Sequence, residues 1–322
     1  MRQYVQKVLT LSRLIWYNEA IITAFQPSIV VITMSERPYV LYCDNTCDLP
    51  EERLAKMDCR IMPLSFEIDG NTYTTEEISM QDFYKRMRED ATTKTSQINV
   101  GDYERVFGEE LEKGNDILYL AFSSGLSGSY NSSLIARDEL LEKYPDAKIR
   151  IVDSLAASAG EGLMLIYTEQ KKREGLSIDE LAQWIEDNRL SFCHVFTVDD
   201  LKYLFRGGRV SRAAAIAGTM LGIKPVLHVD NEGRLIPQGK VRGRKQSIKK
   251  LGEMIRERCG DYENKVVAIS QGDCMEDAKA AADMMKEIFG KKTEVVISYV
   301  GPVIGAHSGP GTLALFFRGD HR

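Results

Sequence analysis

The sequence predicts an α/β fold of two domains, a parallel-sheet α/β/α domain followed by a mixed or antiparallel α/β domain. The chain has 322 residues, which is enough for about two domains. In its first half, short apolar strand segments alternate with helix patterns, as is typical of a parallel sheet covered by helices on both faces. Beyond residue 190 the strand candidates include more hairpin turns. We therefore expect domains at 38–190 and 191–322, after an N-terminal extension at 1–37.

The N-terminal extension fits neither a membrane-spanning helix nor a signal peptide well. Its apolar runs are interrupted by Arg13, Glu19 and Pro27, so they are too short for a membrane-spanning helix. The order of basic, apolar and small residues also fits a signal peptide poorly. We expect the natural start to lie near Met34.

Composition excludes several function classes. The chain is 43% hydrophobic and 28% charged, and its formal charge of -5 gives no support for a broad nucleic-acid-binding face. Its six cysteines are scattered without a Cys-x-x-Cys pair, so neither a zinc site nor a disulfide framework is expected. A cytoplasmic protein without metal or cofactor is the expectation.

The elements of the first domain follow from hydrophobic patterning and helix-start signals. Strands are expected at 39–43, 60–68, 117–122 and 148–152. Helices are expected from about Pro50 to 57, from a capping box at Ser79 to 90, at 102–113, from 129 to 143, at 157–173, and from a second capping box at Ser177 to 188. Asp69-Gly70 predicts a hairpin turn, and 92–100 reads as an extended polar loop.

The second domain has a different pattern of strand and helix candidates. Strands are expected at 192–198, 223–230, 234–237, 266–270, 294–299 and 312–317, with a turn at 231–233. Helices are expected at 199–205, 211–221, 245–259 and 275–289.

Residues 300–311 form a glycine-dense stretch that holds His307, one of only four histidines. Glycine lets a ligand approach the main chain closely, while the two prolines of the stretch restrict it. We expect a shaped loop that holds His307 at the end of a sheet. A turn with an incidental histidine is the plainer alternative.

Two other stretches could meet a ligand. Residues 123–129 form a small-residue loop between a strand and a helix, an arrangement that aims backbone N–H groups at an anion, but the lysine of a Walker A loop is absent. Residues 204–212 place Arg206 and Arg209 beside glycines, with Arg242, Arg244 and Lys245 as further charge. Such arginines suit a phosphorylated ligand or an acidic partner, although a solvated surface is the commoner explanation.

Five stretches together resemble the DegV family. They are Asp44-Asn45-Thr46-Cys47-Asp48-Leu49, Lys94-Thr95-Ser96-Gln97, Ser124-Gly125-Leu126-Ser127-Gly128-Ser129, Arg206-Gly207-Gly208-Arg209-Val210-Ser211 and residues 301–311. They occur in the family's order and span about residues 39–317. Asn45 is a departure, because the family usually has serine there.

The resemblance implies a protein without its own catalytic machinery that binds one long-chain fatty acid in an apolar tunnel between its domains. It also implies a separate kinase subunit that converts the bound acid to an acyl phosphate with ATP. Ser96 and His307 would hold the carboxylate, with Ser65 in the same network. Thr95, Ser127 and Gly128 would lie beside the ligand, and Arg206 and Arg209 on the surface that meets the kinase or the phosphate. Neither nucleic acid nor stable membrane insertion is implied.

Two other functions stay open. The protein could be a lipid carrier or sensor without a kinase. It could also be a serine hydrolase, because Ser127, Asp153 and His307 occur in nucleophile, acid, histidine order. Against the hydrolase, Gly125-Leu126-Ser127-Gly128-Ser129 is not Gly-x-Ser-x-Gly.

Overall fold

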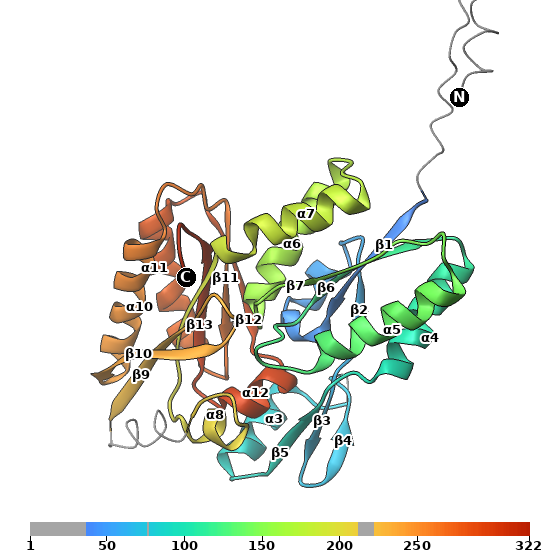
Figure 1. Cartoon of the computed structure of the whole chain (residues 1–322). Helices are drawn as coiled ribbons and strands as arrows, with labels where there is room; N and C mark the ends of the chain where they lie inside the picture. The colour runs from blue at the N-terminus through green and yellow to red at the C-terminus, as the bar shows by residue number, and fades with distance from the viewer. Residues whose placement is uncertain (1–36, 76, 212–221) are drawn as a thin grey trace, which may run out of the picture. The chain divides into compact units, whose positions relative to one another are not determined.

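The computed structural model describes residues 37–75, 77–211 and 222–322, and its strands form three sheets within these ranges (Figure 1). A four-stranded sheet has the order β2-β1-β6-β7, a three-stranded sheet the order β4-β3-β5, and a six-stranded sheet the order β10-β9-β8-β13-β11-β12. The strands are β1 Tyr39–Asp44, β2 Arg60–Met62, β3 Ser65–Ile68, β4 Asn71–Tyr73, β5 Thr93–Ser96, β6 Asp116–Ala121, β7 Ile149–Asp153, β8 Phe192–Thr197, β9 Ile223–Val229, β10 Leu235–Arg242, β11 Val266–Gln271, β12 Glu294–Tyr299 and β13 Leu313–Arg318.

Apart from α12, which was not predicted, the helices begin and end close to the predicted residues. They are α2 Glu51–Leu54, α3 Met80–Arg88, α4 Val100–Glu112, α5 Ser129–Lys143, α6 Ala159–Arg173, α7 Ile178–Asn188, α8 Lys202–Arg206, α10 Arg244–Arg258, α11 Met275–Phe289 and α12 Pro302–Ser308, with short 3-10 turns at Asn45–Cys47 (η1) and Arg189–Ser191 (η2). Ser79 accepts a hydrogen bond from the Asp82 amide, and Ser177 and Glu180 form a complete capping box. Both predicted helix starts are therefore confirmed.

The four-stranded sheet is parallel and covered on both faces, as predicted. Its strands pair in parallel throughout. Along β6, Leu118 and Leu120 pack in one core with α6 and α7, while Ile117 and Tyr119 pack in a second core with α4 and α5. Successive side chains of a strand point to opposite faces, so a strand with apolar residues at every position requires a helix layer on each side.

The six-stranded sheet confirms the mixed character of the second half. Only β11 and β12 pair in parallel among its described neighbours. One face packs against α10 and α11 through residues such as Leu251, Ile255 and Ala281. The other face meets α6.

The three-stranded sheet was not predicted, and two expectations were wrong there. Residues 60–68 form two strands in different sheets, because Pro63 lacks the N–H that a continuous ladder would need. Ser65 therefore begins a strand of the small sheet. The polar stretch 92–100 contains strand β5, whose antiparallel pairing with β3 satisfies its backbone despite its poor strand composition. The β3–β4 hairpin confirms the turn at Asp69-Gly70.

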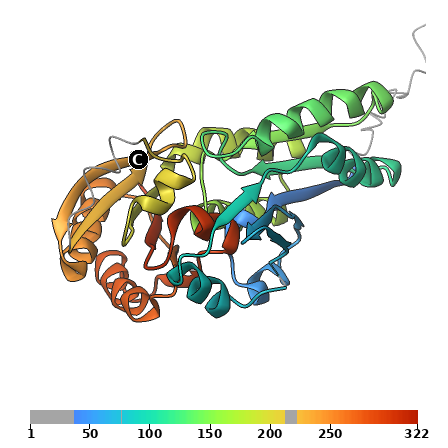
Figure 2. The ribbon, with the colours of Figure 1, turned by 90° about the horizontal axis from the view of Figure 1, so that it is seen from below.

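The stretch 300–311 contains a helix, so the prediction of a loop throughout was wrong. Pro302 stands at the first position of α12, where its missing N–H costs nothing, and Gly309 ends the helix with φ +80°. His307 lies in the last turn of α12. Figures 1 and 2 show α12, in red, beside α8 and the small sheet that contains β5.

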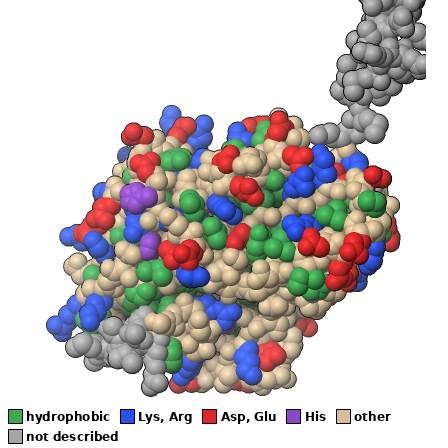
Figure 3. Space-filling view, in the orientation of Figure 1, with side chains coloured by type: hydrophobic (Ala, Val, Ile, Leu, Met, Phe, Trp, Pro, Cys, Tyr) green, Lys and Arg blue, Asp and Glu red, His purple; other side chains and the backbone are tan. Residues whose placement is uncertain are grey.

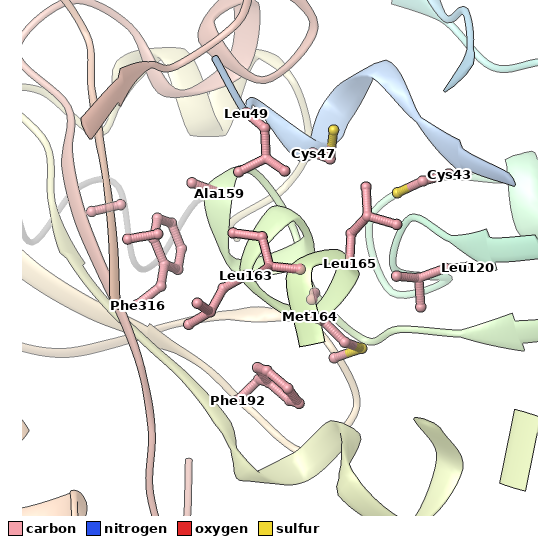
Figure 4. Close-up of a cluster of buried hydrophobic side chains, with 14 of the residues drawn as sticks. Cys43, Cys47, Leu49, Leu120, Ala159, Leu163, Met164, Leu165, Phe192 and Phe316 are labelled. Carbon is pink, nitrogen blue, oxygen red and sulfur yellow. The ribbon is translucent and has the colours of Figure 1, made fainter. Parts of the chain in front are cut away.

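Helix α6 lies between the two large sheets. Leu163 and Ala159 lie near Phe316 of β13, while Leu165 lies on the side of Cys43 and Leu120 (Figure 4). One buried cluster thus contains side chains of both sheets.

Three predictions fall partly or wholly outside this description. The helix expected at 211–221 and the start near Met34 lie outside the described residues. The domain division at 38–190 and 191–322 stays a prediction. Across the described ranges, every helix is too short or too polar to cross a lipid bilayer.

Candidate functional site

A cavity of about 280 Å³ lies between the six-stranded sheet and the elements α12, β5 and α8. Residues from both halves of the chain line it. Its body is apolar, with walls formed by Leu64, Phe122, Leu126, Phe196, Leu204, Val229, Leu235, Val300, Val303, Ile304, Ala314 and Phe316. An apolar cavity with a few convergent polar groups is the usual form of a small-molecule site.

The polar groups gather around His307. Its Nε2 atom lies 2.8 Å from Thr95 Oγ1, so the last turn of α12 is joined to strand β5. Its Nδ1 atom is buried and forms no hydrogen bond with a described residue. A second hydrogen bond, from Thr93 Oγ1 to the Ala306 carbonyl, fixes the same two elements together.

His307 is neutral at physiological pH. Burial, and then the nearby positive charge of Arg209, lower its pKa to about 4. A neutral imidazole has one donor and one acceptor nitrogen, and here Nε2 contacts Thr95 while Nδ1 packs against Gly207.

Arg209 supplies the positive charge of the site. Its Nε and Nη2 atoms donate to the Leu126 carbonyl at 3.1 and 3.0 Å, and Nη1 donates to the Gly207 carbonyl. Burial lowers its pKa, and among the described residues no carboxylate forms an ion pair with it. The guanidinium is therefore bonded but uncompensated, which makes this end of the cavity favourable for an anion.

Two glycines of the sequence motifs make room for these side chains. A Cβ atom at Gly207 would overlap the His307 ring, and one at Gly128 would overlap the Gln97 side chain. Gly208 has a different reason, since its φ is +74° and nothing lies within 4 Å of its Cβ position.

The structure brings most of the predicted site residues to the cavity wall. Those that line it are Thr95, Ser96, Ser127, Gly128, Arg209 and His307. Ser65 does not line it but pairs directly with Ser96 across β3 and β5. Arg206 is exposed at the end of α8, beside exposed Phe205. The ligand-binding roles of these residues stay predictions.

Asn45, which replaces the serine usual at this position of the DegV family, holds the local backbone through hydrogen bonds. Its amide donates to the Leu64 carbonyl at 2.9 Å and accepts from the Leu64 amide at 3.0 Å. These two hydrogen bonds to Leu64, a cavity-lining residue, hold the backbone between β2 and β3 in place. The amide does this with two different atoms, its NH₂ as donor and its oxygen as acceptor.

The three residues of the alternative hydrolase reading are engaged elsewhere. Asp153 accepts hydrogen bonds from the Ser124 and Leu155 amides, and Ser127 Oγ contacts Ser129 Oγ at 3.0 Å. His307 contacts Thr95 instead. A nucleophile–histidine–acid relay needs each pair within bonding reach, and no hydrogen bond of the described residues joins any two of the three.

Sequence reasoning missed five polar residues of the wall, Gln97, Ser158, His194, Ser308 and Thr312. Gln97 is the last residue of the DegV-like stretch Lys94-Thr95-Ser96-Gln97, and its Nε2 donates to Ser132 Oγ at 3.2 Å. His194 could have been found by strand alternation, because it shares a face of β8 with Phe196. Ser158 precedes α6 at φ +56°, a conformation that sequence alone does not reveal.

Ser158 belongs to a buried network that joins three elements. Its hydroxyl bonds the Asp48 carboxyl group and lies 2.7 Å from Ser270 Oγ of β11. Ser158 and the amide of Gly301 favour the ionised form of Asp48, but burial outweighs them and raises the pKa of Asp48 to about 8. Asp48 is thus a neutral hydrogen-bonding group at pH 7, next to the residue that precedes α12.

The remaining predicted charges do not reach the cavity. Arg244 pairs with Asp277 and Asp199, while Arg242 and Lys245 are exposed. On the face seen in Figure 3, basic and acidic side chains are interspersed.

Comparison with known proteins agrees with this architecture. The family model described as "Uncharacterised protein, DegV family" matches residues 40–320. A DegV domain-containing protein of Clostridium perfringens is 45% identical over 287 residues, which make up 88% of this chain and 98% of that protein.

Two solved structures are similar over the same part of the chain. A DegV lipid-binding protein from Thermotoga maritima is 30% identical with a TM-score of 0.76, covering 88% of this chain and 99% of that one. A fatty-acid-binding DegV family protein from Thermus thermophilus is 30% identical with a TM-score of 0.74, covering 88% of this chain and all of the other. Family model, relatives and fold agree, and the chain belongs to the DegV family.

Proposed function

We propose that this protein binds one long-chain fatty acid in the cavity and presents its carboxylate to a separate kinase subunit. The observation that carries the proposal is the division of the cavity, which has an apolar body and one polar end with an uncompensated arginine. Burying an alkyl chain contributes about 0.8 kcal/mol per methylene, so the tail supplies most of the affinity. The similar proteins of Thermotoga maritima and Thermus thermophilus bind lipid and fatty acid, respectively.

The carboxylate is assigned to the polar end. Ser96 and His307 hold it, and Ser65 supports Ser96 from the neighbouring strand. A carboxylate that has left water needs donors, which hydroxyls and an imidazole supply. The positive charge of Arg209 stabilises it without a direct ion pair, so its oxygens stay available for attack on a phosphoryl group.

Binding is tested by extracting the purified full chain with organic solvent and identifying released molecules by mass spectrometry. A near-equimolar long-chain fatty acid supports the proposal. Ser96→Ala and His307→Ala should each weaken rebinding of that acid at least tenfold, because a charge-assisted hydrogen bond contributes about 1.5–3 kcal/mol. His228→Ala is the matched control, since His228 does not line the cavity. If no fatty acid is released and none raises the melting temperature, the proposal falls.

The kinase step is a separate part of the proposal. Exposed Arg206 and Phe205 follow the cavity-lining Leu204 in α8, which gives a partner a basic and apolar surface beside the polar end. Because the step requires ATP, the proposal includes a cytoplasmic location. The protein contributes binding, and the kinase subunit contributes catalysis.

Acyl phosphate formation by the reconstituted pair tests this step. Arg206→Ala should keep fatty acid binding and lower the rate with the kinase subunit, while Arg105→Ala, exposed in α4, should change neither. Unchanged turnover by Arg206→Ala would remove this surface from the proposal. Binding of fatty acid without any turnover would leave a lipid carrier.

A further inference from the structure

Arg322 is a buried cation whose guanidinium binds main-chain carbonyls. The residue is 7% exposed, and its side chain donates five hydrogen bonds. The acceptors are the carbonyl oxygens of Ser154, Leu155, Arg189, Phe192 and Asp230. Burial lowers the pKa of Arg322 to about 10, so the group is still charged at pH 7. A buried charge is stable only where its donors are bonded, and here the partners come from four separate segments of the chain.

Strand register places this guanidinium at the end of the cavity opposite His307. Thr312 is at the polar end, because its hydroxyl bonds the carbonyl of the residue after His307. From Thr312 to Phe316, alternate residues line the cavity. Two residues beyond Phe316, β13 pairs with Phe192, whose carbonyl accepts from Arg322 Nε at 3.1 Å. The guanidinium therefore lies one row of residues beyond the far wall.

Two of the segments that Arg322 binds carry parts of that far wall. The loop 154–158 ends with two residues that line the cavity. The turn 230–234 joins Val229 to Leu235, which line it as well and pair across β9 and β10. Arg322 donates to carbonyls of both segments and so holds them together.

The same segments contact each other and have a backbone that must be held in place. Leu155 and Ser158 have φ values of +50° and +56°, a left-handed conformation that is costly for residues other than glycine. A Cβ atom at Gly233 would lie 3.1 Å from Leu155 Cα, and Ser123 Oγ donates to the Gly233 carbonyl at 2.9 Å. Such a conformation persists only where its surroundings fix it. The bond from Arg322 to the Leu155 carbonyl is one of these restraints.

The distance from the polar end to this closure can be expressed in carbon atoms. Six residue steps lead from Thr312 to Arg318, the partner of Phe192, and span about 20 Å at about 3.4 Å per residue. An extended alkyl chain advances about 1.3 Å per carbon, so roughly sixteen carbons span the same distance. An acid of this length with its carboxylate near His307 brings its methyl end to the segments that Arg322 holds.

We propose that Arg322 is a positioning residue that closes the far end of the cavity and thereby limits the bound fatty acid to about sixteen carbons. This inference rests on the proposed fatty acid binding. A shorter acid buries fewer methylenes and binds more weakly. A longer acid has to push the two segments apart or overfill a packed wall, and both cost binding energy.

A chain-length series with the full chain tests the inference. The lipid-free protein is titrated with dodecanoic, tetradecanoic, hexadecanoic, octadecanoic, eicosanoic and docosanoic acids, each in competition with a fluorescent fatty acid. Wild-type affinity should rise to about hexadecanoic acid, and eicosanoic acid should bind about tenfold more weakly than hexadecanoic acid, a difference of about 1.4 kcal/mol. In Arg322→Ala these two acids should bind within about threefold of each other, while dodecanoic acid binds as it does to the wild type.

Two further variants assign the effect to the guanidinium. Arg322→Lys keeps the charge but loses the planar fork of donors, so its length profile should lie between those of the wild type and Arg322→Ala. Arg318→Ala is the matched control, because this arginine of β13 bonds Asn188 and Ser191 instead of the two segments. It should lower the melting temperature and keep the wild-type length limit.

The outcomes separate the two proposals. If Arg322→Ala keeps the wild-type limit, or loses affinity for every acid by the same factor, the role of Arg322 is overturned while fatty acid binding stands. The same broadening in Arg318→Ala, or a wild type that binds docosanoic acid as tightly as hexadecanoic acid, also overturns it. Where Arg322→Ala does not fold, Arg322→Lys decides by the same criteria. If none of the acids binds, this inference and the proposed function both fall.

Discussion

Single buried residues of this protein carry unusual protonation states, and Asp48 is the clearest case. Its carboxyl group bonds Ser158 and lies next to Gly301, yet it has no buried cation among the described residues to balance a charge. Burial therefore keeps it protonated at pH 7. A neutral carboxyl group donates as well as accepts, which suits a network of hydroxyl groups.

The raised pKa of Asp48 gives a pH-dependent prediction. Its pKa is about 8 in the folded protein and near the ordinary 3.8 when unfolded. Between these values the folded state binds more protons, so the group's contribution to stability is complete below about pH 4 and is lost as pH rises to about 8. Asp48→Asn keeps a neutral amide in place and should remove this dependence.

Urea unfolding at pH 5, 6, 7 and 8 measures the effect. The free energy of unfolding of Asp48→Asn minus that of the wild type should rise with pH, by up to about 1.4 kcal/mol per pH unit. Asn45→Asp serves as a counterpart that adds an acid in the same loop without removing Asp48. A constant difference between Asp48→Asn and wild type would mean that Asp48 is ionised in the folded protein.

At the scale of elements, the turn after α8 contains two adjacent glycines that are required for different reasons. Gly207 has an ordinary helical φ of -75° but lies against His307, whereas Gly208 has φ +74° and open space around it. The first glycine is required by a neighbour and the second by the backbone. The sequence shows both only as Gly-Gly.

Alanine at each position should separate these causes. Gly207→Ala should displace the His307 ring, break its contact with Thr95, and weaken fatty acid binding at least tenfold. In this variant the pKa of His307, followed by NMR, should rise from about 4 toward the ordinary 6.5 as the ring leaves its buried position. Gly208→Ala should cost about 1–2 kcal/mol of stability through its left-handed backbone and leave binding within twofold. The same loss of binding in both variants would show that the turn acts only as a unit.

Sequence patterns predicted long elements well and short ones poorly. Apolar runs and capping boxes gave α6, α7 and the strands β1, β6 and β7 nearly to the residue. Strand β5 was missed because Thr-Lys-Thr-Ser has no apolar face, and its pairing with β3 is a tertiary contact. Helix α12 was hidden by its glycines and prolines, which usually mark loops.

The site was predicted in part for the same physical reason. Motif residues such as His307 and Arg209 could be named, since their residue types suggest chemistry. That Thr95 bonds His307, and that Ser65 lies behind Ser96, depends on the small sheet, which sequence patterns did not reveal. His194 was missed because a histidine within an apolar strand resembles any other core residue.

At the scale of the whole molecule, the shared core around α6 couples the two large sheets. Leu163 packs in a cluster that includes Leu120 of one sheet and Phe316 of the other (Figure 4). The Asp48–Ser158–Ser270 hydrogen bonds cross the same boundary. The two sheets share one core and one buried polar network. Neither sheet can therefore keep its core buried without the other.

We therefore predict that residues 37–322 unfold in one cooperative transition. Leu163→Ala, in the shared core, and Leu251→Ala, in the core under α10 and α11, should each lower the free energy of unfolding by about 2–5 kcal/mol. Both should shift the whole urea curve, followed by far-UV circular dichroism, because loss of one sheet exposes the core of the other. Two separate phases, with Leu251→Ala moving only one of them, would show instead that the sheets unfold independently, and that the cavity could open to a ligand without global unfolding.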